Sequence, residues 1–160
     1  MPGPRLSSLL ALVEPDDFLC HVIGDYILQS DWVALNKSRR WDVALLHALL
    51  YSVPFVARTR SRGALATIAA THFAIDRWRL TRYLIWAKNW LSPRGNVPLS
   101  ACDPVTGFPR ERPPWMTFWL YVIIDNTVHV LINAWALRTF GRRAPRPPRG
   151  RVASSRARAC

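Results

Sequence analysis

The chain contains four histidines, and each lies in a different apolar, helix-like stretch. Three of them have an aspartate four residues away, and these pairs are His21 with Asp25, His72 with Asp76, and His129 with Asp125. Residues four apart share one face of an α-helix, with Cβ atoms roughly 5–6 Å apart. A buried ionisable group is costly unless it is paired or bound to a metal. We therefore expect these polar faces to meet inside a bundle of helices.

The composition favours a small membrane protein with basic flanking segments. Half of the 160 residues are hydrophobic and eight are tryptophan, yet the formal net charge is +12. Most of the basic residues lie outside the apolar stretches, as they do in membrane proteins. At this length we expect one domain with tails. The expected parts are an N-terminal segment 1–15, a helical membrane domain 16–140, and a tail 141–160.

Four apolar stretches predict an all-α fold, a compact membrane-embedded bundle of about four helices, of which two to four cross the bilayer. The helices are expected over about 16–36, 41–56, 63–91 and 115–140. The last stretch is the strongest candidate span, because about 20 apolar residues cross the roughly 30 Å of hydrocarbon in a bilayer. The segment 92–114 is rich in proline and glycine, which predicts a loop outside the bilayer.

The C-terminal tail contains seven arginines and no acidic residue, so we expect it to be disordered. It could bind anionic lipid head groups or, less favourably, nucleic acid without sequence preference. Lipid is favoured because the tail directly follows a membrane helix. A solvated tail without a function is the other interpretation. The basic tail also favours a cytoplasmic C-terminus.

Together the polar helix faces supply seven candidate metal ligands. Imidazole and carboxylate groups suit a divalent metal, with zinc or manganese favoured and iron as an alternative. Seven donors exceed one tetrahedral site and match a site that holds two metal ions. Some of the aspartates could instead orient a histidine. The candidate ligands are His21, Asp25, His47, His72, Asp76, Asp125 and His129.

The first predicted helix carries the run His21-Val-Ile-Gly-Asp25-Tyr-Ile-Leu-Gln29, followed by Asp31, Ala34 and Lys37. This run resembles the signature of an uncharacterised family of short membrane proteins carried by bacteria and phages. The family pattern continues through the next three helices, where the matching residues are His47, His72 with Asp76, and Asp125-Asn126-x-x-His129. The resemblance covers about residues 17–135. It implies an integral protein of a bacterial inner membrane, or of a host membrane if a phage encodes it, and implies no activity.

Two positions depart from this family pattern. Val33 stands where methionine is usual, and Asn126 stands where glutamine is usual. Neither position belongs to the candidate ligands, so the predicted metal site is unaffected. In ligand spacing alone, the chain is also similar to membrane metal-dependent hydrolases and all-helical zinc phosphodiesterases.

The leading functional hypothesis is a metal-dependent hydrolase that acts on a phosphoester or a lipid head group at the bilayer. Asp25, Asp76 and Asp125 would be its catalytic carboxylates, which bridge, ligate or orient, and a water with its pKa lowered towards about 7 would be the nucleophile. Four further side chains are predicted to bind substrate, namely Arg77, Arg79, Gln29 and Lys37.

Two alternatives use the same residues. The chain could be a non-enzymatic phage or bacterial membrane protein, active in interaction or lysis, whose His–Asp pairs only hold helices together. It could also form an ion or proton pathway, because ionisable residues inside membrane helices often line one. The bilayer is the expected partner in every case, and no feature of the sequence favours one oligomeric state.

Overall fold

The computed structural model describes residues 13–93 and 96–141, and this part of the chain is helical. The predicted all-α class is confirmed. The segment 1–12 and nearly all of the tail 141–160 lie outside the described residues. The cytoplasmic C-terminus and the lipid-binding tail therefore stay predictions. The helices are α2 (Pro15–Val22), α3 (Asp31–Asn36), α4 (Trp41–Ser52), α5 (Arg62–Trp78), α6 (Thr81–Trp90) and α7 (Pro114–Phe140).

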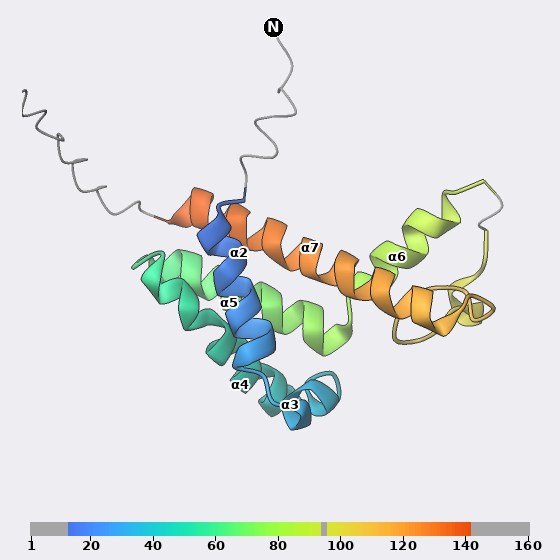
Figure 1. Cartoon of the computed structure of the whole chain (residues 1–160), viewed down its shortest axis with the longest axis horizontal. Helices are drawn as coiled ribbons and strands as arrows, with labels where there is room; N and C mark the ends of the chain where they lie inside the picture. Colours follow the sequence, from blue (N-terminus) through green and yellow to red (C-terminus); the bar gives the residue numbers. More distant parts are fainter. Residues whose placement is uncertain (1–12, 94–95, 142–160) are drawn as a thin grey trace, which may run out of the picture.

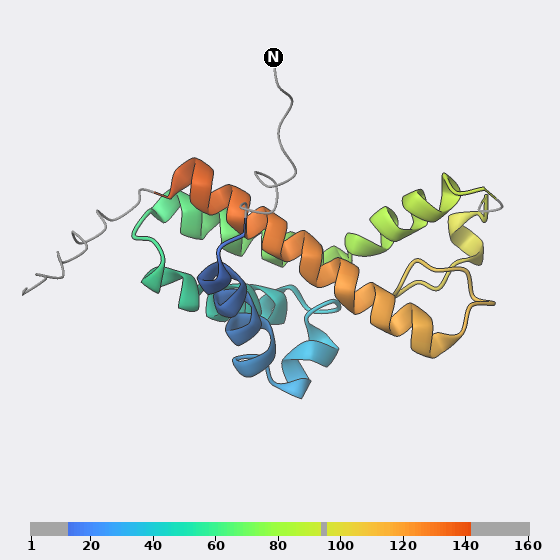
Figure 2. The same ribbon diagram turned by 45° about the horizontal axis from the view of Figure 1, so that its top comes forward.

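Helix α5 lies in the middle of the bundle and packs against both α4 and α7. Figure 1 shows α7 as the longest helix, with α2 crossing it near one end. At the other end, α6 and the first turns of α7 extend as an arm away from α2, α3 and α4, and Figure 2 shows the same arm from a second direction. The described part therefore consists of a helical bundle and one arm, both built on α7.

The single helix predicted over 16–36 is wrong, because the structure divides it. After α2, residues Ile23–Ile27 form a π-helical turn, η1, in which the Leu28 N–H donates to the Ile23 carbonyl at 3.0 Å. Helix α3 starts afresh beyond Ser30, whose hydroxyl accepts a hydrogen bond from the Val33 N–H at 3.4 Å. Such π turns are frequent at functional sites, and this one carries Asp25.

The π turn packs directly onto α4 at Gly24. A Cβ atom added at Gly24 would lie only 2.8 Å from the backbone carbonyl oxygen of Tyr51. Only glycine permits so close an approach of the two backbones without a shift. The approach brings Asp25, the next residue, to within 3.2 Å of His47 on α4.

The single helix predicted over 63–91 is also wrong, because α5 and α6 are separate helices. Between them Arg79 has a left-handed backbone, with φ 50° and ψ 50°. Glycine or asparagine usually takes this conformation at a helix end. Neither residue marks the break, so the apolar pattern of the sequence runs straight through it. The turn sends α6 into the arm.

The other two helix predictions agree with the structure more closely. The helix predicted over 41–56 is α4 followed by a 3-10 turn, η2 (Pro54–Ala57), which starts at a proline. The strongest predicted span, 115–140, is α7. Within the described residues α7 alone is long and apolar enough to cross a membrane, while Trp41–Ala57 is apolar but shorter. Only one such helix is found in the described residues, so the embedding in a membrane and the two to four crossing helices stay predictions, which rest on α7 and on the apolar side chains that the bundle exposes.

The buried interior of the bundle is both apolar and polar. A small apolar cluster brings together Cys20, Tyr51, Phe55, Ile68 and Ala136. The four histidines lie in the same interior, and none of them is more than 2% exposed. Because imidazoles are seldom this deeply buried in one place without partners, their contacts identify the candidate site.

Candidate metal centre

Four side chains from η1, α4 and α5 form what we call the first ligand group, Asp25, His47, His72 and Asp76. His47 Nε2 lies 2.9 Å from His72 Nε2, 3.2 Å from an oxygen of Asp25 and 3.3 Å from an oxygen of Asp76. His72 Nε2 lies 3.0 Å from the same Asp76 oxygen and 3.9 Å from the same Asp25 oxygen. The four ligand atoms therefore surround one point.

These distances fit a tetrahedral ion of the size of zinc. With metal–ligand bonds of roughly 2.0–2.2 Å, the corners of a tetrahedron are about 3.3–3.6 Å apart. The five separations given above are 2.9–3.9 Å. Two imidazole nitrogens and two carboxylate oxygens are also donors that divalent zinc and manganese accept. The first ligand group could thus hold a divalent metal.

The protonation states of two members of this group, His72 and Asp25, suit metal ligands. At His47 burial lowers the pKa, but the hydrogen bonds with Asp25 and Asp76 outweigh burial and raise the pKa. Burial lowers the pKa of His72 to about 4, although the charge of Asp76 opposes this, so its imidazole is neutral near pH 7. Burial by itself would raise the pKa of Asp25, but the hydrogen bond from His47 and the charge of Lys37 outweigh it. The net pKa of Asp25 lies below its usual value, and its carboxylate is ionised. Neutral imidazole and ionised carboxylate are the forms that bind metal.

A second ligand group consists of Asp76, Asp125 and His129. Asp76 belongs to both groups, because one of its oxygens faces His72 while the other lies 3.9 Å from His129 Nε2. The Nδ1 atom of His129 lies 2.9 Å from the backbone carbonyl of Asp125, to which it donates. Its Nε2 is buried and has no hydrogen-bond partner among the described residues. Since buried polar groups are nearly always bonded, this free nitrogen fits a metal ligand.

Lys37 covers the outer side of the first ligand group. Its Nζ lies 2.9 Å from Asp76, 3.2 Å from His47 and 3.6 Å from Asp25. His72 Nε2 lies at similar distances from the same three atoms, so the lysine and the imidazole must be on opposite faces of the triangle that these atoms form. Burial lowers the pKa of Lys37, but the charges of Asp76 and Asp25 outweigh this and raise it. Lys37 is therefore a largely buried ammonium ion.

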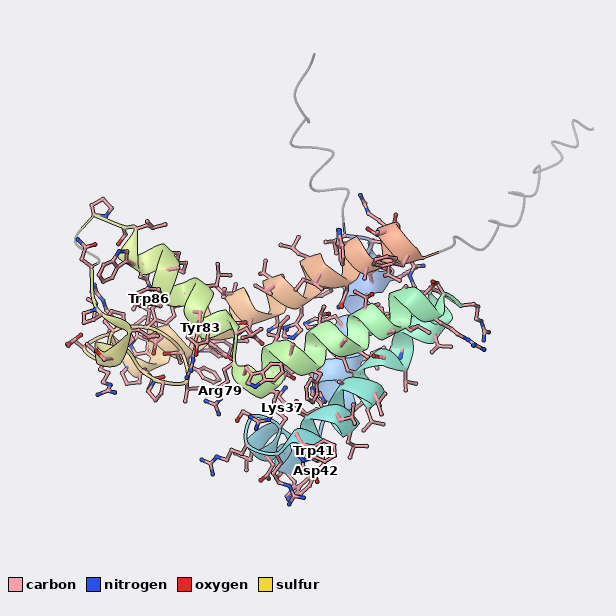
Figure 3. The ribbon with its side chains drawn as sticks, turned by 180° about the vertical axis from the view of Figure 1, so that it is seen from behind. Lys37, Trp41, Asp42, Arg79, Tyr83 and Trp86 are labelled. Atoms are coloured by element: carbon pink, nitrogen blue, oxygen red, sulfur yellow. The ribbon has the colours of Figure 1, made fainter. Side chains whose placement is uncertain are left out.

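Arg77 and Arg79 hold the turn that carries Lys37. Each donates to Ser38 at 2.8 Å, Arg77 to the backbone carbonyl and Arg79 to the hydroxyl. Figure 3 shows Lys37 and Arg79 close together near the end of α5. The contacts fix both arginines on this turn. Their predicted role in binding a phosphate stays a prediction.

His21 lies beside the two ligand groups without joining them. Its Nδ1 is 2.9 Å from the Tyr51 hydroxyl and its Nε2 is 2.6 Å from the Asn126 side-chain oxygen. Its ring stacks beside that of His129, with centroids 6.0 Å apart. The π turn separates His21 from Asp25, and no hydrogen bond or ion pair between the two occurs in the described structure. That His21 ligates a metal stays a prediction.

Both ligand groups lie within a part of the sequence that matches a known family. The family DUF3307, which is described as a protein of unknown function, matches residues 17–142. The chain belongs to the DUF3307 family. This confirms the resemblance to an uncharacterised family. No curated protein and no solved structure matches the chain.

An open hollow of about 140 Å³ adjoins the ligand groups of this DUF3307 protein. Two predicted substrate-binding residues, Gln29 and Lys37, line it together with Asp25 and Asp125 of the two groups. Tyr26 and Asn126 also line it, and the Asn126 amide donates to the Tyr26 hydroxyl at 2.7 Å. The hollow has room for a small polar group next to the carboxylates.

Three side chains that support the site of this DUF3307 protein have no place in the predicted ligand pattern. The ring of Tyr51 stacks on His72, with centroids 3.6 Å apart, and its hydroxyl accepts a hydrogen bond from Asn133 at 2.5 Å. The Thr81 hydroxyl donates to Asp125 at 2.5 Å. Tyr51 could have been found, because it lies four residues after His47 and so on the same helix face. Nothing in the sequence marks Thr81.

Proposed function

We propose that this protein is a membrane-associated, metal-dependent hydrolase that uses two neighbouring divalent ions. The observation that carries the proposal is the position of Asp76, whose two oxygens face different ligand groups. Two-metal hydrolases hold their ions about 3.5–4 Å apart to act on one displaced oxygen. The carboxylate of Asp76, which belongs to both ligand groups, would allow two ions to lie this close together.

The first ion would be held by Asp25, His47, His72 and Asp76, and the second by Asp76, Asp125 and His129. Zinc or manganese is the favoured metal, because both accept mixed imidazole and carboxylate ligands. When bound, the ions would supply activation of water and polarisation of a phosphoryl oxygen. The second group has only three protein ligands and so leaves room for substrate or water.

A phosphoester or a lipid head group is the substrate that the surrounding side chains favour. Lys37 places a largely buried positive charge at the wall of the hollow, where it can hold an anionic oxygen. Gln29 offers an amide on the same wall. Asp25, Asp76 and Asp125 would serve as ligands or orient the histidines. Arg77 and Arg79 would act on substrate only if they left Ser38.

The membrane is the proposed location because of α7 and the apolar surface around it. Trp115 and Trp135 on α7 are 70% and 53% exposed, and Leu49 on α4 is 55% exposed. Large exposed apolar surfaces are uncommon on soluble monomers and mark contact with a membrane or a partner. We place α7 across an inner membrane, with the basic tail at anionic head groups on the cytoplasmic side.

Metal content is the direct test of the proposal. We expect the purified protein to contain about two divalent ions per chain by elemental analysis, and His72→Ala to lose them. His21→Gln is the matched control, because His21 belongs to neither ligand group, although its ring lies beside that of His129, and this variant should keep its ions. Hydrolysis of bis(4-nitrophenyl) phosphate should then depend on the metal and on His72. A wild-type protein without ions, or ions retained by His72→Ala, would overturn the proposal.

A second candidate function is structural, and one observation favours it. Lys37 already compensates the charges of Asp25 and Asp76, and His47 contacts His72 directly, so the charges of the first ligand group are balanced without an ion. The cluster would then only hold the helices of a non-enzymatic membrane protein together. Thermal unfolding of His47→Ala, His129→Ala and the double variant separates the two. Energetic coupling that disappears with chelator supports a shared metal centre, and coupling that chelator leaves unchanged supports the structural role.

A further inference from the structure

The arm contains a cavity of about 370 Å³ that is separate from both ligand groups. Ligand-binding pockets commonly have volumes of roughly 300–1,000 Å³. The cavity lies between α6, the loop that follows it and the start of α7. Large apolar side chains form much of its wall, among them Trp86, Trp90, Met116 and Leu120.

The loop that forms one wall of this cavity is held in place by specific contacts. The Trp86 indole donates to the Val97 carbonyl at 3.1 Å, across the cavity wall. Arg82 donates to the Pro104 carbonyl at 2.7 Å. Gly107 has φ 75°, and a Cβ there would overlap the Arg82 carbonyl. The described part of the predicted loop 92–114 is therefore an ordered wall, and the cavity is preformed.

The polar groups of the cavity favour an anion. Lys88 and Arg112 line it, and none of the described residues that line it is acidic. Asn89 lines it as well, and its side-chain nitrogen is buried without a hydrogen-bond partner among the described residues. Two cations and one free donor beside an apolar wall are complementary to a molecule with an acyl chain and an anionic head.

The surroundings of the cavity favour a membrane as the source of that molecule. Trp115 and Trp119, on the same first turns of α7, are 70% and 59% exposed, and Trp90 on α6 is 41% exposed. Tryptophans gather at the boundary between lipid and water, where lipid head groups lie. Figure 3 shows Trp86 on α6, in the arm and away from Lys37 of the candidate metal centre.

We propose that this cavity binds one anionic membrane lipid. Its acyl chain would lie against Trp86, Trp90 and Leu120, and its phosphate would contact Lys88, Arg112 and the Asn89 amide. This binding requires no metal, and so it goes beyond the proposed hydrolase function. It would hold the arm at the membrane surface.

Quenching of tryptophan fluorescence by brominated lipid tests the proposal. The full chain is reconstituted into phosphatidylcholine vesicles with one tenth of the lipid brominated, either as phosphatidylglycerol or as phosphatidylcholine. We expect greater quenching by brominated phosphatidylglycerol. The excess should fall sharply in Trp86→Phe/Trp90→Phe, which removes the two tryptophans that line the cavity, and should fall at least several-fold in Lys88→Gln/Arg112→Gln.

Two further variants keep the test decisive. Arg39→Gln/Arg62→Gln removes the same charge from exposed positions elsewhere and should keep the excess quenching. Val97→Phe fills the cavity without changing charge and should abolish the excess. Equal quenching by the two lipids would overturn the proposal. An excess that survives Val97→Phe or Trp86→Phe/Trp90→Phe would also overturn it. So would an excess that both double charge variants lose equally, because the lipid would then be attracted to the charged surface as a whole.

Discussion

Replacing Lys37 by methionine should destabilise the metal-free protein by about 3 kcal/mol. The substitution keeps the volume of the side chain but leaves the carboxylates of Asp25 and Asp76 without their cation. The Lys37 side chain is 18% exposed, and those of Asp25 and Asp76 are 10% and 7% exposed. Removing one partner of a buried ion pair typically costs about 3–5 kcal/mol. We take the lower end of this range because Lys37 keeps some contact with solvent.

The distances show why the loss should exceed that of a surface pair. The ammonium lies 2.9 Å from Asp76 and 3.6 Å from Asp25. At an effective dielectric constant of 20, unit charges at these separations attract each other by about 5 kcal/mol per pair. Desolvation of the three groups offsets much of this attraction. For a chain of this size, a net loss of about 3 kcal/mol corresponds to a fall in Tm of roughly 10 °C.

Thermal unfolding with chelator and with added zinc or manganese measures this effect. With chelator, Lys37→Met should unfold about 10 °C below the wild type. With metal, the difference should shrink, because a bound ion compensates the same two carboxylates. Arg40→Gln is the control, since Arg40 and Asp42 form an exposed pair, and it should change Tm little in either condition. Equal Tm values for Lys37→Met and the wild type in chelator would refute the reasoning.

Three other substitutions test individual contacts. Asp125→Asn should lower the metal content from about two ions to one, as measured by elemental analysis, because Asp125 belongs only to the second ligand group; loss of both ions would contradict separate groups. Tyr51→Phe should cost about 1–3 kcal/mol in denaturant unfolding, because His21 and Asn133 lose a buried partner; an unchanged midpoint would show that these bonds add nothing. Gly24→Ala should cost about 1–3 kcal/mol by the same assay, because its Cβ would meet Tyr51 at 2.8 Å; a neutral result would mean that η1 moves freely away from α4.

The regular parts of the fold follow directly from the apolar pattern. The end points of α7 were predicted to within a residue, because Pro114 and Gly141 bracket one long, mostly apolar stretch. The breaks were missed for a different reason. At Arg79 a left-handed residue ends α5, and in η1 a π turn replaces the α-helical hydrogen bonds. Both breaks depend on contacts with other helices, and periodicity along one helix cannot report these.

The candidate site was predictable where the helices are regular. His72 with Asp76 and His129 with Asp125 lie on helices α5 and α7, and each pair faces the interior as its spacing predicts. His21 and Asp25 have the same spacing but do not pair in the described structure, because Asp25 lies in a π turn. Its extra residue per turn changes the direction in which Asp25 points. The position of Lys37 depends on how α3 packs against α4, and helix spacing carries no information about that.

The order of the ligands along the chain has a consequence for how such a protein would be made. Every member of the first ligand group lies between Asp25 and Asp76, whereas the second group needs Asp125 and His129 on α7. His129 is translated 53 residues after Asp76, which takes roughly 3–10 s at 5–20 residues per second. If the two ions bind as proposed, the nascent chain could capture the first ion while α7 is still being synthesised. The second would then be loaded only when α7 arrives, with Asp76 already in place to receive it.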